Sequence, residues 1–78
     1  MTITLNEVRD VYELVGITQS CCGNVIARQG RYAVNAKSIL GLFSLDLTKP
    51  IELLTEQPMR NDEAKIEEFC KRIRGREQ

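Results

Sequence analysis

Three cysteines are the first residues of this 78-residue chain that could do chemistry, because the chain contains no histidine. Cys21 or Cys22 would be a nucleophile if its thiol were exposed and ionised at neutral pH. A zinc site needs four ligands at characteristic spacing, and three cysteines, two of them adjacent, do not supply it. An odd number of cysteines also gives no disulfide framework. We therefore expect no metal and no cofactor, and we expect Cys22 and Cys70 to be small buried hydrophobic residues.

Ser38 is the next residue whose side chain could take part in a reaction. Ile39, Leu42 and Phe43 follow it at helical spacing and predict a helix within residues 36–45. A serine at the start of that helix can cap it through the side-chain hydroxyl. The same position would tolerate a phosphate group, because the unpaired N–H groups of a helix start can receive phosphate oxygens. The pattern leaves both roles of Ser38 open.

The elements before Ser38 follow from hydrophobic periodicity. Alternation over residues 2–5 predicts a short strand. A helix is expected to begin at a cap at Asn6, to have Glu7 in its first turn and to end between residues 16 and 22. Its expected buried face consists of Val8, Val11, Tyr12 and Val15. A β-hairpin over residues 24–34 follows, with its turn at Gln29-Gly30.

Three further segments complete the chain. Lys49-Pro50 breaks the chain before a strand at residues 51–54, and residues 57–61 form a polar connection. The last helix has the clearest apolar stripe, formed by Ile66, Phe69, Cys70 and Ile73. The order βαββαβα predicts an α+β fold, a four-stranded antiparallel sheet with three helices on one face. A chain of this length forms a single domain, residues 1–78.

Charge and hydropathy exclude several classes of partner. Lys plus Arg and Asp plus Glu each number 11, which gives no overall attraction to nucleic acid or anionic lipid. A basic cluster of Lys71, Arg72, Arg74 and Arg76 ends the last predicted helix, where cations complement the helix dipole. The chain has neither a basic-then-apolar leader nor an apolar run of about 18 residues. We expect a cytoplasmic protein that binds neither nucleic acid nor membrane.

The stretch VNAKSILGLFSLDL, residues 34–47, resembles the serine region of HPr, the small phosphocarrier protein of the bacterial sugar phosphotransferase system. The matching positions, in order, are Lys37, Ser38, Ile39, Leu40, Leu42, Leu45 and Asp46. The predicted order of elements and the chain length are also similar to those of that family, whose fold is an open-faced sandwich. The resemblance implies an HPr-like domain over most of the chain.

The chain departs from the family at the site of phosphate transfer. HPr proteins carry phosphate on a histidine between the first strand and the first helix, followed two residues later by an arginine and then a proline. Counting back from Ser38 without gaps places Glu7 at the histidine, Arg9 at the arginine and Asp10 at the proline. An acyl phosphate on Glu7 would usually need a magnesium site of further carboxylates. We therefore expect a protein that is not an enzyme and is not competent for histidine phosphotransfer.

The resemblance also implies a regulatory role. A dedicated serine kinase modifies the matching serine in Gram-positive bacteria, and the apolar residues after it dock onto enzymes and regulators. By position, Ser38 would be phosphorylated, and the partner-binding residues would be Lys37, Ile39, Leu40 and Phe43. The implied partners are the kinase, phosphotransferase components or a transcriptional regulator. We expect Leu40 on the surface and Leu42 and Leu45 in the core, while Ile39 and Phe43 could be either.

Two alternatives remain open. The chain could be a phosphocarrier or thiol-based enzyme that uses another nucleophile, with Cys21 and Cys22 as candidates. It could also be a structural module in which Leu40 and Phe43 form a homodimer face. The expected oligomeric state is a monomer or a weak homodimer.

Overall fold

The element order agrees with the βαββαβα order predicted from the sequence. The structure, a computed structural model, describes residues 1–5, 7–57 and 61–76. The elements are β1 (Thr2–Ile3), α1 (Val8–Gln19), β2 (Asn24–Gln29), β3 (Tyr32–Asn35), α2 (Ile39–Phe43), β4 (Ile51–Glu56) and α3 (Asp62–Arg76). Among the described residues, no helix is long and apolar enough to cross a membrane.

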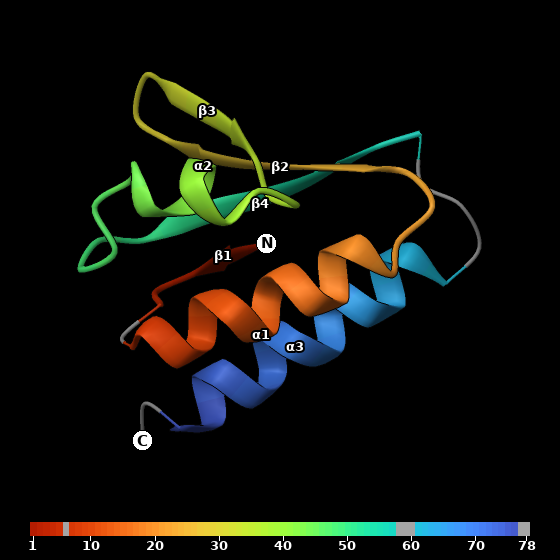
Figure 1. Ribbon diagram of the computed structural model, residues 1–78. Coiled ribbons are helices and arrows are strands. Elements are labelled where there is room, and N and C mark those ends of the chain that lie inside the picture. Colours follow the sequence, from red (N-terminus) through yellow and green to blue (C-terminus); the bar gives the residue numbers. More distant parts are fainter. Residues whose placement is uncertain (6, 58–60, 77–78) are drawn as a thin grey trace.

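The four strands form one sheet in the order β1-β4-β2-β3, and every neighbouring pair is antiparallel. The β2–β3 hairpin closes at the pair Gln29 and Tyr32, and Gly30 adopts a φ of 58° in the two-residue turn between them. Figure 1 shows α1 and α3 side by side against one face of the sheet, with α2 beside α1. The predicted α+β open-faced sandwich is confirmed.

The sheet has one buried and one open face because its side chains alternate. On β2, Val25 and Ala27 are buried under the helices. On β4, Ile51 and Leu53 are buried in the same way. The open face carries polar neighbours of these residues, including the exposed ion pair of Arg28 with Glu52.

The buried face of α1 differs from the predicted one. Val11 and Val15 are buried as expected, but Val8 is 56% exposed and Tyr12 is 55% exposed. The face that enters the core consists of Val11, Leu14, Val15 and Thr18, with Asp10 buried at its start. These four residues also have i, i+3, i+4, i+7 spacing, but a threonine completes the stripe and conceals it in a purely hydrophobic pattern.

Most other boundaries agree within a few residues. The stripe of α3 is fully buried as predicted, at Ile66, Phe69, Cys70 and Ile73. Strand β4 extends two residues beyond the predicted end, whereas β1 pairs with β4 only at Thr2 and Ile3. The expected cap Asn6 and residues 58–60 of the polar connection lie outside the described residues.

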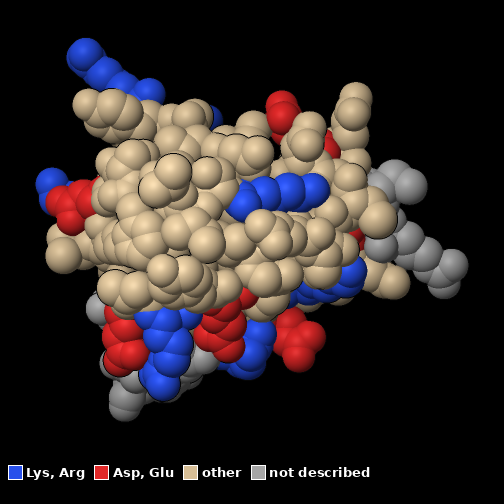
Figure 2. Space-filling model, in the orientation of Figure 1, with Lys and Arg blue, Asp and Glu red and all other residues tan. Residues whose placement is uncertain are grey.

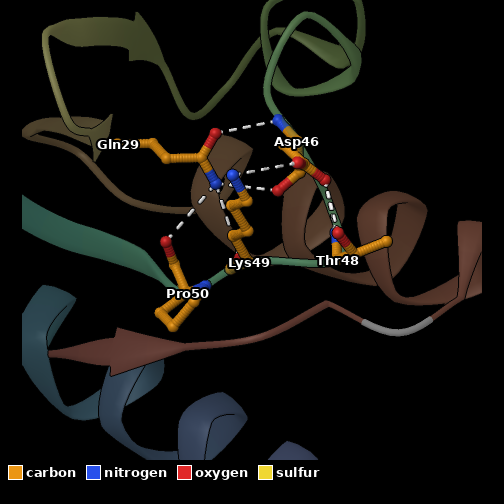
Figure 3. A network of polar contacts seen from close by, with 5 residues as sticks. All are labelled: Gln29, Asp46, Thr48, Lys49 and Pro50. Atoms are coloured by element: carbon orange, nitrogen blue, oxygen red, sulfur yellow. Dashed lines mark hydrogen bonds and ion pairs between the residues drawn. The ribbon is translucent and has the colours of Figure 1, made fainter.

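The loop after α2 is fixed to the end of β2 by the side chain of Gln29 (Figure 3). Its amide Nε2 donates to the carbonyl of Asp46 at 2.7 Å, and its Oε1 accepts the Asp46 N–H at 2.8 Å. The Asp46 carboxylate in turn accepts the N–H and hydroxyl of Thr48, at 3.0 and 2.6 Å. These bonds hold the loop that follows α2 against the end of β2.

The Asp46 carboxylate should make folding stability depend on pH. The hydrogen bond from the Thr48 side chain, and then that from its N–H, hold the pKa of Asp46 below its ordinary value of 3.8. A lowered pKa in the folded state gives stability that is present above the unfolded pKa and is lost as pH falls through the folded one. Urea midpoints of the parent and Asp46→Asn should differ at pH 6 and converge below about pH 4. A difference that stays constant with pH would contradict this role.

Candidate functional site

Ser38 caps α2 as the sequence predicts. Its backbone is extended, with φ −105° and ψ 120°, and its side-chain Oγ accepts the N–H of Gly41 at 3.1 Å. The Ser38 carbonyl accepts the N–H of Leu42 at 3.1 Å. The hydroxyl is therefore placed at the first turn of a helix of five residues, Ile39–Phe43.

Gly41 lets α2 approach the end of β3. A Cβ atom at this position would lie 3.3 Å from the Asn35 carbonyl oxygen and 3.4 Å from the Cβ atoms of Ser38 and Val34. A Cβ atom here would require these neighbouring atoms to move by a few tenths of an ångström. The close approach holds the capped serine against the sheet.

The C-terminal end of α1 holds the two residues before Ser38. The buried Thr18 hydroxyl lies 2.8 Å from the Ala36 carbonyl and 3.1 Å from the Val15 carbonyl. Its hydrogen bond to Ala36 links α1 to the residues just before Ser38. Gln19 Nε2 donates to the Lys37 carbonyl at 3.3 Å. The Lys37 ammonium donates in turn to the carbonyl of Cys21 at 3.0 Å, two residues beyond the end of α1. Sequence reasoning missed Thr18 and Gln19, because neither carries a motif.

An exposed apolar patch lies beside Ser38, and we define it as Val8, Tyr12, Leu40 and Phe43. Leu40 is 83% exposed, as predicted, and Phe43 is 38% exposed. The rings of Tyr12 and Phe43 meet edge to face, with centroids 6.2 Å apart and an interplanar angle of 69°. Figure 2 shows a broad, mostly uncharged surface over α1 and α2, with a basic side chain lying across it and most charged side chains along its edges.

The patch extends further than the sequence indicates, because the two α1 residues were expected in the core. Because the buried stripe of α1 runs through Leu14 and Thr18 in place of Val8 and Tyr12, the latter two side chains face solvent and extend the surface formed by the α2 residues. Leu42 and Leu45 are buried as predicted, and Ile39 is partly buried against the core. The candidate partner surface is therefore built from two helices.

Glu7 and Arg9 lie at the opposite end of α1 from the residues that hold Ser38. Glu7, expected in the first turn of α1, instead occupies its cap position with extended backbone, and its side chain makes no cap hydrogen bond. Its carboxylate lies 3.0 Å from the guanidinium of Arg9, and both side chains are well exposed. The distance along α1 from Glu7 to Thr18 is roughly 16 Å at 1.5 Å per residue. The ion pair flanks Val8 of the apolar patch in the sequence and is remote along α1 from the residues that hold Ser38.

The cysteines differ from the prediction in one respect. Cys70 is buried as expected, but Cys22 is exposed and Cys21 is the buried member of the adjacent pair. The reason is the buried Asp62 carboxylate, which accepts the N–H groups of Cys22 and Gly23 at 3.1 and 2.8 Å and fixes the turn after α1. This turn directs Cys21 inward and leaves Cys22 on the surface.

Two of the thiols are poor nucleophiles. Burial, and secondly the charge of Asp62, raise the pKa of the Cys21 thiol. Burial likewise raises the pKa of the Cys70 thiol. Within residues 1–5, 7–57 and 61–76, no group of three or more Cys, Asp and Glu side chains is arranged to hold a metal ion.

Solved structures of other proteins share this fold, including the following two. HPr-C-His from Thermoanaerobacter tengcongensis matches with a TM-score of 0.77 at 22% sequence identity, over 95% of this chain and 89% of that chain. The Bacillus subtilis catabolite repression protein Crh, an intertwined swapped dimer, matches with a TM-score of 0.69 at 22% identity, over 92% of this chain and 83% of that chain. No protein-family model and no curated protein sequence matches the chain. The fold is thus HPr-like.

The thiols can be ranked by alkylation with iodoacetamide at neutral pH. Cys22 should react first, and Cys21 and Cys70 should react more than about tenfold more slowly, because both are buried and less ionised. Peptide mass mapping after timed quenching measures the three rates separately. Fast modification of Cys21 in the folded chain would contradict this ranking and revive the thiol-based alternative.

The contact from Thr18 to Ala36 can be tested with two matched substitutions. Thr18→Val removes the donor and leaves a buried carbonyl unpaired, which should lower the free energy of unfolding by about 1–3 kcal/mol. Thr18→Ser keeps the hydroxyl and loses only a methyl group. Hydrogen exchange at the Gly41 amide should accelerate in the valine variant and not in the serine variant. Equal exchange in both would show that the contact does not position Ser38.

Proposed function

We propose that this chain is an HPr-like protein that does not carry phosphate on a histidine and acts through protein interactions controlled by phosphorylation of Ser38. The observation that carries the proposal is the placement of a capping serine directly beside an exposed apolar patch, in which Leu40 is 83% exposed. An exposed apolar patch with a polar rim is typical of a protein interaction site. An edge-to-face aromatic pair, Tyr12 with Phe43, supplies a suitable anchor.

The composition and the Glu7 geometry both argue against phosphate carriage. The chain has no imidazole, and the carboxylate at the corresponding position pairs with Arg9 on the surface. A carboxyl phosphate hydrolyses readily, and its formation usually needs a magnesium site of further carboxylates. The proposal therefore gives Glu7 and Arg9 no role in group transfer.

The regulatory reaction would occur on the kinase. The Ser38 Oγ attacks the γ-phosphorus of ATP, the hydroxyl proton passes to a base of the kinase, and ADP leaves. The product carries roughly −1.5 to −2 additional charge at the edge of an apolar patch. That charge changes which partner the patch accepts, either a phosphotransferase component or a transcriptional regulator. Ile39, Leu40 and Phe43 provide the apolar contacts in this proposal.

A second candidate is a homodimer that buries the apolar patch. The exposure of Leu40 favours it, because a leucine so accessible in the monomer would gain by burial in an interface. Sedimentation at micromolar concentration separates the two candidates. A monomer supports control by an external partner.

The phosphorylation proposal can be tested with a serine kinase that acts on HPr and with ATP. We expect the mass of one phosphate group on Ser38, no addition in Ser38→Ala, and normal addition in Ser44→Ala, which removes the exposed hydroxyl at the other end of α2. Leu40→Ala should raise the KM about tenfold, because truncating a central apolar contact costs more than 1 kcal/mol. Its stability should change by less than about 0.5 kcal/mol.

Tyr32→Ala is the control for Leu40→Ala, because Tyr32 is exposed on β3 outside the patch. It should leave the KM unchanged. Two results would refute the proposal: no phosphate on Ser38, or phosphorylation of the chain by phosphoenolpyruvate and the first enzyme of the phosphotransferase system. Authentic HPr is the positive control for the second reaction.

A further inference from the structure

Lys37, the neighbour of Ser38, uses all three of its polar groups inside the molecule. Its N–H donates to Asn35 Oδ1 at 2.9 Å, and its carbonyl accepts Gln19 Nε2 at 3.3 Å. Its ammonium donates to the Cys21 carbonyl at 3.0 Å in a partly buried setting. The Lys37 side chain therefore connects the neighbour of the modifiable serine to Cys21, 16 residues earlier and just beyond the end of α1.

A second lysine reaches the same helix end from another element. Lys65 of α3 donates its ammonium to the Ser20 carbonyl at 3.0 Å. Both cations lie at carbonyls of the two residues that follow α1, near the negative end of its dipole, where positive charge is favourable. The carboxylate facing this turn is that of Asp62, which holds Cys22 and Gly23. Lys65 thus makes the same kind of contact as Lys37, but its position in the sequence is remote from Ser38.

We propose that Lys37 transmits phosphorylation of Ser38 to the C-terminal end of α1, its ammonium leaving the Cys21 carbonyl to pair with the phosphate. The proposal rests on the proposed function only in taking Ser38 as the phosphorylated residue. It assigns Lys37 as a positioning residue in the unmodified chain and as the counter-ion of the phosphate in the modified chain.

Reach and strength both favour this exchange. Consecutive Cα atoms lie about 3.8 Å apart, and lysine carries its charge on a flexible four-carbon stem, so the ammonium can reach a phosphate on the next residue. Both bonds, to the carbonyl and to the phosphate, are charge-assisted because the ammonium is ionised, but the phosphate dianion adds a Coulomb attraction that a neutral carbonyl does not offer. The carbonyl of Cys21 offers only a neutral acceptor. The phosphate dianion therefore outcompetes it.

The consequence is a change at α1 that needs no movement of the sheet. When the ammonium leaves, the Cys21 carbonyl loses its donor, while Lys65 still holds the adjacent carbonyl of Ser20. The contacts of Thr18 and Gln19 with residues 36 and 37 keep Ser38 in place. Phosphorylation would thus be sensed at the end of the helix that carries half of the apolar patch.

The experiment uses a full-length chain with phosphoserine at position 38, ligated at the Ser20–Cys21 bond and labelled with ¹³C at the Cys21 carbonyl. The phosphate is titrated by ³¹P NMR. A nearby ammonium favours the dianion, so the second pKa of the phosphate should be lower by about 0.5 unit or more with Lys37 than in Lys37→Met. Lys37→Arg should restore the lower value, and Lys65→Met should leave it unchanged.

The labelled carbonyl gives a second, independent measurement. Phosphorylation should shift the Cys21 carbonyl carbon upfield in the parent, as expected when a hydrogen-bond donor leaves, and should not do so in Lys37→Met. An equal phosphate pKa in the parent and Lys37→Met would overturn the proposal, as would an equal effect of Lys65→Met. Because the phosphoserine is installed chemically, failure of a kinase to act on Ser38 refutes the proposed function and leaves this result intact.

Discussion

The tie between the C-terminal end of α1 and the backbone of residues 36 and 37 is the constraint on which the candidate site depends. Thr18 and Gln19 donate to two successive carbonyls, and Ala36 also donates its N–H to the carbonyl of Val25. A buried carbonyl without a partner would cost about 1–3 kcal/mol, so the segment has little freedom to move. Ser38 follows directly after the two fixed carbonyls and precedes the first residue of α2, so these contacts set its position.

The helix that follows is too short to be stable by itself. Five residues provide few internal hydrogen bonds, and isolated helices shorter than about 12 residues are marginal in water. Three features fix it in place: the capping hydroxyl of Ser38, the close contact of Gly41 with β3, and the loop held by Gln29. With both ends held and Leu42 buried, Leu40 is left facing solvent.

The two ends of α1 differ in how they are held. Glu7 and Arg9 neutralise each other on the surface, whereas the far end of the helix is tied to α2 and α3. Asp62 belongs to this second group, because its buried carboxylate orders the turn that separates Cys21 from Cys22. Thr18, Gln19, Lys37 and Asp62 thus make their hydrogen bonds around the C-terminal end of α1 and the residues that follow it.

The sequence by itself determined the order of elements, the buried stripe of α3, the cap at Ser38 and the outward position of Leu40, because each depends on local spacing and local hydrogen bonding. It did not reveal the orientation of α1, since Thr18 completes the buried stripe through a long-range contact that hydrophobicity does not encode. It also did not reveal that Cys22 is exposed, that Val8 and Tyr12 join the α2 residues, or that Lys37 reaches Cys21. Each of these depends on which side chains meet after the helices have packed, and only the tertiary structure decides that.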